Sequence, residues 1–498
     1  MRRFKASIYN YTANSINAIV MLINGIVLVP IYFQYMSLST YGAWLATGNV
    51  VAMLGMVESG FSVVITQKLA VALGSKDSKQ FSLLAGANIL SAAIITSVLF
   101  LLGLIFSFFV ADLVNASASI KQPITIAFII ALAASALSIL VSLFGAFPQV
   151  WQETKIVGII GIIVSILGII STLIYLHAGF GVIALALGYF TRSILNLVCQ
   201  GVWIFLRWKK YQYPKPQYNL TVLVELLKDC FYPFLSKISS VVMNNSQSFI
   251  IALFINPGIA AIYDITQKVT VILSNFVNMA NVSLFALYSL TFASKNKIEI
   301  NSLIKYVSNL FIVLLLTVLV YSAVFSKPFI HFWVGLDKYG GDTLLIFIVV
   351  AALVSQVRQF TNILLQTGGL INKSAKLDIV SMILYVLVLL VIVKPAQMYA
   401  IPIATFVSGI IFIGLYLRLL KKDLLVDINT ILKISYKLLI IVVPVVLLHY
   451  VLKVNLLNIK TLTVYFLLFS LVYLRVLIIT NRLFVEQLLL RIRNGKSK

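Results

Sequence analysis

The sequence predicts an all-α polytopic membrane protein with about 14 transmembrane helices, and three observations carry that prediction. Of the 498 residues, 61% are hydrophobic and 10% are charged, whereas soluble domains are about 45–50% apolar and about 25% charged. The apolar residues form continuous runs of about 20 residues, the length that a helix needs to cross a bilayer. They do not alternate with polar residues as in the strands of a membrane β-barrel.

A hydropathy window of about 19 residues, closed at charged, Pro-rich or Gly-rich breaks, gives the individual helices. Six spans lie near 11–33, 40–66, 83–110, 123–146, 156–177 and 181–206. Eight more lie near 231–254, 259–291, 303–326, 343–367, 377–394, 397–419, 432–452 and 460–480. We therefore expect an N-terminal six-helix lobe (1–206), a basic cytoplasmic connector (207–222), a C-terminal six-helix lobe (223–419), and two extra helices with a basic cytoplasmic tail (420–498).

The positions of Lys and Arg predict that both termini lie in the cytoplasm, because basic residues collect in cytoplasmic loops. With the N-terminus inside, 26 of the 38 bases face the cytoplasm, six face outward and six lie within spans. One span more or fewer would destroy this alternation, so fourteen spans are favoured and twelve are the alternative. The net charge of +24 is then explained by topology and by attraction to anionic membrane lipids, about 1 kcal/mol per base. No nucleic-acid partner is expected.

The two lobes resemble each other at their starts. Asn24 to Gly42 runs through a span and an uncharged loop into Tyr41-Gly42, and Ser246 to Asp264 does the same into Tyr263-Asp264, 222 residues later (246 − 24). Six spans separate the copies, so both have the same membrane orientation. This predicts a parallel repeat of two lobes around a cavity, with chance similarity between apolar segments as the alternative.

Motifs for enzymatic chemistry are missing from the sequence. It contains no G-x-x-x-x-G-K-[ST] loop and no H-E-x-x-H helix, and Cys199 and Cys230 lack the spacing of metal ligands. We expect no catalytic residue, no metal and no cofactor. A membrane-embedded polysaccharide polymerase would need acidic residues on outward loops, where Asp337 and Asp342 are the only pair.

Ionisable residues within the spans are candidates for function, because each costs at least about 2.5–3.5 kcal/mol at the bilayer centre. An Arg guanidinium suits phosphate because its fork donates two parallel hydrogen bonds. Snorkelling to the membrane surface is the alternative for Arg192, Lys237 and Arg358, and a structural ion pair with Asp264 is the alternative for Lys268. The candidate substrate-binding bases are Arg192, Lys237, Lys268 and Arg358.

Two acids and several amides complete the candidate set. Glu58 and Asp264 are candidate coupling or structural acids, and Asp264 lies four residues before Lys268 on one helical face. Amides concentrate in the opening spans of each half, which favours a hydrophilic cavity over hydrogen bonding between helices alone. The candidate substrate-binding amides are Asn24, Asn245, Gln247 and Asn278.

Short motifs along the chain carry a family resemblance. They include Tyr41-Gly42-Ala43-Trp44, Val57-Glu58-Ser59-Gly60-Phe61, Gln67-Lys68-Leu69-Ala70 and Leu365-Gln366-Thr367-Gly368. With these motifs the chain resembles polysaccharide-unit flippases of the Wzx type. These belong to the multidrug/oligosaccharidyl-lipid/polysaccharide exporter superfamily, which also holds lipid II flippases and multidrug and toxin extrusion (MATE) transporters. A departure is the seventh span, where Asn and Ser near 244–246 replace an acidic residue that many members carry.

The resemblance implies twelve core helices in two lobes plus two extra helices. It also implies that the protein flips undecaprenyl-diphosphate-linked oligosaccharide units, of O-antigen, capsule or exopolysaccharide, across a bacterial cytoplasmic membrane by alternating access. No covalent step is implied, and a polysaccharide polymerase and a chain-length regulator stay open as partners. A multidrug or cation antiporter is the alternative, which should prefer a cavity dominated by acids; here intramembrane bases outnumber acids. A membrane-embedded polymerase is third.

Overall fold

A computed structural model describes residues 25–56, 59–284, 288–289, 291–292, 296–424, 426–427 and 458–480. Within these ranges all regular structure is helical. Helices are the expected form for such apolar sequences, because each backbone N–H and C=O must be satisfied within its own segment when no water is near.

The chain packs into two compact units, and each is described by itself. Unit 1 comprises Met1–Asp264 and Ile371–Ile401, and unit 2 comprises Ile265–Leu370 and Pro402–Lys498. Helix α9 (Leu220–Asn245), which follows the connector, thus packs with helices that precede it, and α15 (Ile371–Ala396) packs against α9. The six-helix lobes expected from the sequence (1–206 and 223–419) have other bounds than these units and stay a prediction.

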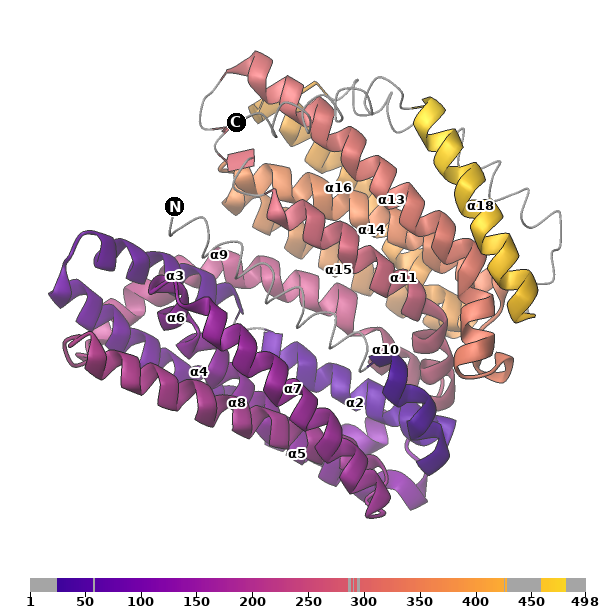
Figure 1. Ribbon diagram of the computed structural model, residues 1–498, viewed down its shortest axis with the longest axis horizontal. Coiled ribbons are helices and arrows are strands. Elements are labelled where there is room, and N and C mark those ends of the chain that lie inside the picture. Colours follow the sequence, from indigo (N-terminus) through magenta and orange to yellow (C-terminus); the bar gives the residue numbers. More distant parts are fainter. Residues whose placement is uncertain are drawn as a thin grey trace. The chain divides into compact units, whose positions relative to one another are not determined.

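Unit 1 is built around long helices that lie side by side. Helix α5 packs between α4 and α8, and α7 packs along α8 (Figure 1). Helix α9 packs against α3, α4 and α15. The bounds are α2 (Leu38–Met56), α3 (Ser59–Gly74), α4 (Ser78–Leu113), α5 (Ala118–Phe144), α6 (Ala146–Val150), α7 (Thr154–His177), α8 (Val182–Lys210) and α10 (Gln247–Phe254), together with α9, α15 and the start of α11 (Pro257–Ser283).

Side-chain caps and one small residue position these helices. The Asp77 carboxylate accepts from the Gln80 N–H (2.9 Å) at the start of α4, and the Asn219 amide oxygen accepts from the Thr221 N–H (2.8 Å) at the start of α9. Such caps satisfy N–H groups that the first turn of a helix leaves unpaired. Gly42 of α2 lies so close to α11 that a Cβ would be 1.7 Å from the Pro257 carbonyl oxygen.

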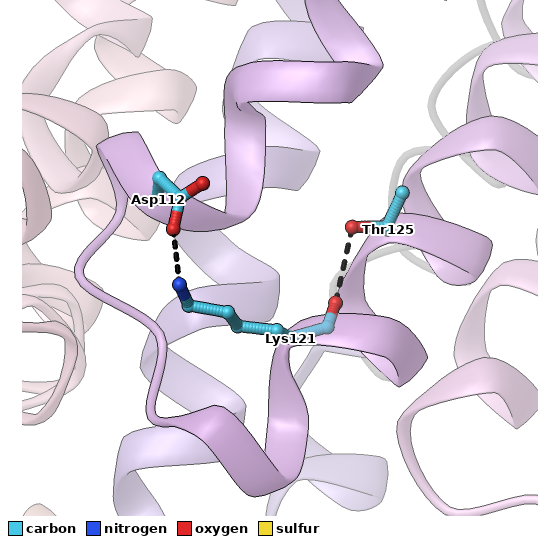
Figure 2. Close-up of polar contacts among 3 residues, drawn as sticks. All are labelled: Asp112, Lys121 and Thr125. Carbon is cyan, nitrogen blue, oxygen red and sulfur yellow. Dashed lines mark hydrogen bonds and ion pairs between the residues drawn. The ribbon is translucent and has the colours of Figure 1, made fainter.

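The connection between α4 and α5 is fixed at one end of unit 1. Lys121 forms an ion pair with Asp112, and the Thr125 hydroxyl donates to the Lys121 carbonyl (3.0 Å; Figure 2). Asn115, in the same connection, donates to the carbonyls of Ala252 (2.8 Å) and Leu253 (2.9 Å) and so caps the end of α10. This loop therefore ties α4 and α5 to α10.

Unit 2 contains the rest of α11, α13 (Lys297–Trp333), α14 (Asp342–Thr367), α16 (Ala400–Leu424) and α18 (Ile459–Thr480). Helix α18 packs along α13 through aromatic rings, with Tyr321 at the centre of contacts to Phe466, Phe469 and Tyr473. The Tyr321 hydroxyl also donates to Ser470 (2.7 Å). Figure 1 shows α18 in yellow beside α13.

Seven helical stretches in the described residues are long and apolar enough to cross a membrane. They are Ser78–Leu113, Ala118–Val150, Lys155–His177, Val182–Lys210, Ile298–Trp333, Asp342–Thr367 and Ile371–Leu424, the last covering two predicted spans. A multi-pass helical membrane protein is therefore confirmed. The predicted span near 432–452 and most of the one near 11–33 lie outside the described residues, and the count of fourteen and the orientation stay predictions.

Candidate functional site

The predicted site residues belong to both units. Arg192, Lys237, Asn245, Gln247 and Asp264 lie in unit 1, and Lys268, Asn278 and Arg358 lie in unit 2. Asn24 and Glu58 lie outside the described residues. Asp264 and Lys268 share α11, as the sequence predicts for a pair four residues apart.

Arg358 is a buried base in unit 2. It lies on α14 with its side chain 5% exposed. The neighbouring Phe360 ring stacks on Phe311 of α13 at 4.2 Å between centroids. A snorkelling arginine would expose its guanidinium at the membrane surface, so that alternative is wrong for Arg358. A cation kept at this depth is a candidate for function.

Arg192 occupies a different setting between α7 and α8. A Cβ placed on Gly168 of α7 would lie 2.9 Å from the Arg192 Cβ, so the stem of Arg192 packs where α7 has no side chain. The residue is partly buried. Gly168 therefore lets two helices close around a charged side chain within unit 1.

The seventh predicted span is broken where its amides cluster. Helix α9 ends at Asn245 and α10 starts at Gln247, with Ser246 between them. The Asn244 side-chain amide donates to the Ser240 carbonyl (2.8 Å). Helical hydrogen bonding nevertheless continues through Ser246, because its N–H donates to the Val242 carbonyl (3.2 Å) and its carbonyl accepts from the Ile250 N–H (2.9 Å). Asn245 and Gln247 flank this junction, and their role in substrate binding stays a prediction.

Asp378, on α15, is a buried acid that the sequence reasoning missed and that becomes a candidate site residue. Its side chain is 2% exposed, and the Ser236 hydroxyl of α9 donates to it at 2.5 Å. Ser374 and Ser381 are also buried, and the Ser381 hydroxyl has no hydrogen-bond partner among the described residues. Asp378 lies at the predicted start of span 377–394, so the sequence alone indicates a residue at the membrane surface. The signal that could have found it is the spacing of 374, 378 and 381, which places three polar residues on one helical face.

The charged candidate residues of the two units include more bases than acids. Four bases, Arg192, Lys237, Lys268 and Arg358, accompany two acids of the described residues, Asp264 and Asp378. The bases therefore still outnumber the acids once Asp378 is counted.

Comparison with known proteins agrees with this arrangement. The sequence profile of the polysaccharide biosynthesis protein family matches residues 5–291. A structure titled lipid II flippase MurJ, inward closed conformation, is similar at 16% identity, with a TM-score of 0.72, and the match covers 97% of this chain and all of that one. An inward-facing MATE multidrug resistance transporter is similar at 13% identity with a TM-score of 0.63, covering 81% of this chain and 94% of that one. No curated protein matches the chain by sequence.

These observations define a multi-pass helical membrane protein whose fold is similar to those of the MurJ flippase and MATE transporter structures. The profile match spans more than half of the sequence, so the chain belongs to the polysaccharide biosynthesis protein family. The family resemblance predicted from the sequence is confirmed.

Proposed function

We propose that the protein flips undecaprenyl-diphosphate-linked oligosaccharide units, of an O-antigen, capsule or exopolysaccharide, from the inner to the outer leaflet of a bacterial cytoplasmic membrane. The observation that carries this proposal is the buried guanidinium of Arg358 in a family tied to polysaccharide synthesis. An arginine at this depth can receive a diphosphate through paired, charge-assisted hydrogen bonds.

The remaining polar residues suit the rest of such a substrate. Asn245 and Gln247 beside the break between α9 and α10 offer donors and acceptors to sugar hydroxyls. Lys237, Lys268 and Arg192 supply further positive charge for the diphosphate or for acidic sugars. The reaction moves the lipid by alternating access, and the protein forms and breaks no covalent bond.

A specific observation supports a second candidate function, cation antiport. Asp378 is a buried acid on a helix of a MATE-like fold, and an acid at this depth is a natural proton or cation site. The two functions are compatible if Asp378 couples an ion gradient to flipping. A membrane-embedded polymerase has no comparable support.

The test is the fate of the lipid-linked sugar after deletion of the gene. We expect lipid-linked repeat units to accumulate on the inner leaflet and surface glycan to disappear, with both reversed by the wild-type gene. Increased drug sensitivity with normal surface glycan would contradict the flippase proposal and support the antiporter. A polymerase would instead leave single repeat units on the outer leaflet, so the three functions give different outcomes.

A further inference from the structure

One end of unit 1 carries an aromatic cluster at the junction of α6, α7 and α8. The Trp151 and Tyr213 rings stack with planes 6° apart and centroids 5.5 Å apart. Trp208 meets Phe147 edge to face at 5.3 Å, and Trp203 lies 6.2 Å from Trp151. Trp and Tyr are enriched where a membrane meets water, so this cluster marks the interfacial end of the unit.

The chain segment that follows α8 is held against this cluster. The Gln217 N–H donates to the Ser82 carbonyl (3.1 Å), and the Ser82 hydroxyl donates to the carbonyl of Lys215. Gly86 of α4 permits the contact, because a Cβ there would lie 2.0 Å from the Gln217 carbonyl oxygen. The segment 211–217 is therefore a fixed part of the surface of unit 1.

Positive charge exceeds negative charge around the cluster. Five bases lie in or beside it: Lys155, Arg207, Lys209, Lys210 and Lys215. The acid there is Glu153, and both of its oxygens are engaged, one by Tyr211 (2.6 Å) and one by the Nε of Arg207 (3.0 Å). Lys155, Lys209, Lys210 and Lys215 are exposed, so most of the excess charge faces outward from the unit.

Two exposed apolar stripes run from this basic end along the neighbouring helices. On α8 the stripe contains Ile194, Val198, Val202 and Phe205, each about half exposed, and it leads to Lys209 and Lys210. On α7 the stripe contains Ile159, Ile163, Ile170 and Ile174, and it starts four residues after Lys155. The Lys209 Nζ lies 4.5 Å from the centre of the Phe205 ring, so the ammonium lies directly at the end of an apolar stripe. Since α7 packs along α8 and Arg207 pairs with Glu153, the basic ends of both stripes lie at the same end of the helix pair.

We infer that this end of the α7 and α8 pair, with the stripe that leads to it on each helix, binds anionic phospholipids. The acyl chains lie along the α7 and α8 stripes, and the phosphate-bearing headgroup contacts Lys155, Lys209 and Lys210. A zwitterionic phospholipid could fill the apolar stripes equally well, but it would bring no net charge to the basic end. The site lies outside the residues assigned to substrate transport, and its existence does not depend on which lipid-linked molecule the protein carries.

Quenching of tryptophan fluorescence by brominated lipids tests the site. Trp44→Phe and Trp333→Phe leave three of the five tryptophans, and all three belong to the cluster. This parent is reconstituted in vesicles in which either phosphatidylglycerol or phosphatidylcholine carries the bromine, at equal mole fraction. We expect stronger quenching by brominated phosphatidylglycerol. Replacing Lys155, Lys209 and Lys210 by Gln should reduce that preference by roughly fivefold per lysine engaged.

A matched control uses the adjacent pair Lys421 and Lys422 in the last turn of α16, in unit 2. Lys421→Gln with Lys422→Gln should leave the preference of the three tryptophans unchanged. Native mass spectrometry of the unmodified protein, with the same two lipids, gives a second measurement that does not depend on tryptophan replacement. Equal quenching by both lipids, or an equal loss of preference in the control pair, would overturn the inference.

Discussion

The Ser236 hydroxyl on α9 donates a 2.5 Å hydrogen bond to the carboxylate of Asp378 on α15, in a position where Asp378 is 2% exposed. An isolated buried carboxylate is costly, and burial favours its neutral form unless partners stabilise the charge. The Ser236 and Asp378 pair therefore gives unit 1 a candidate coupling site.

Asp378→Asn should reduce transport with little change in folding. The amide keeps the size of the carboxyl group and can still accept from Ser236, but it cannot take up a proton or carry the charge. We expect a loss of about tenfold or more in the rate of lipid-linked sugar transfer, which corresponds to about 1.4 kcal/mol in the barrier. Surface glycan in a deletion strain and transfer in reconstituted vesicles both measure the effect.

Two variants make the Asp378 result interpretable. Ser236→Ala keeps the carboxyl but removes its donor, so a smaller loss is expected. Asp337→Asn changes an exposed acid on the loop between α13 and α14 and should leave transport unchanged. If Asp378→Asn transports as well as the wild type at every pH, Asp378 is a structural residue.

The transport rate should depend on both the charge and the shape of the side chain at position 358. Arg358→Ala removes a buried cation, and hydrogen bonds to charged groups contribute about 1.5–3 kcal/mol each, so transport should fall roughly ten- to a hundredfold. Arg358→Lys keeps the charge but loses the planar fork, and we expect an intermediate rate. Arg418→Lys, a change near the cytoplasm-facing end predicted for α16, serves as the control. Normal surface glycan in Arg358→Ala would remove this residue from the substrate site.

The sequence predicts the helices well and the site only in part, for different physical reasons. Helices such as α4 and α14 follow from continuous apolar runs, because a long apolar segment has few other structures open to it in a membrane. Arg358 could be chosen as a candidate because a charge within such a run is conspicuous. Asp378 was missed because it lies at the edge of a run, where the sequence does not distinguish a surface carboxylate from one covered by Ser236 of another helix. The close contact of Gly42 with Pro257 could not be predicted from the sequence either, since the two residues lie 215 positions apart (257 − 42).

Gly42→Ala should weaken the packing of α2 on the start of α11. A Cβ at this position would lie 1.7 Å from the Pro257 carbonyl oxygen and 3.3 Å from the Ala261 Cβ, so the backbones must separate. Overpacking of this kind costs about 1–3 kcal/mol. Thermal unfolding in detergent measures this loss of stability as a lower midpoint temperature. Gly201→Ala in α8 is the matched control, because a Cβ there meets no atom within 4 Å, and it should leave the midpoint unchanged or raise it. Equal midpoints for the two variants would contradict the close contact.

The contact between Tyr211 and Glu153 predicts an alkaline limit to the stability of unit 1. The hydrogen bond from the Tyr211 hydroxyl to Glu153 raises the pKa of Tyr211 above its ordinary value of 10.0, with smaller effects from burial and from the negative charge of Glu153. A raised pKa means that the folded protein holds the phenol proton more tightly than the unfolded chain does. The stabilisation is therefore complete below pH 10 and is lost as the pH rises through the higher, folded-state pKa.

Tyr211→Phe removes that proton, so the variant should be less stable than the wild type at neutral pH. It should also lose less stability between about pH 9 and pH 12, the range around the ordinary pKa of tyrosine. Tyrosine absorbance near 295 nm follows the titration, and the fluorescence of Trp151, Trp203 and Trp208 follows the release of the segment 211–217. Tyr218→Phe changes an exposed tyrosine just beyond that segment and should keep the wild-type alkaline profile. If Tyr211→Phe and the wild type lose stability in parallel over this range, the hydrogen bond to Glu153 does not control the alkaline limit.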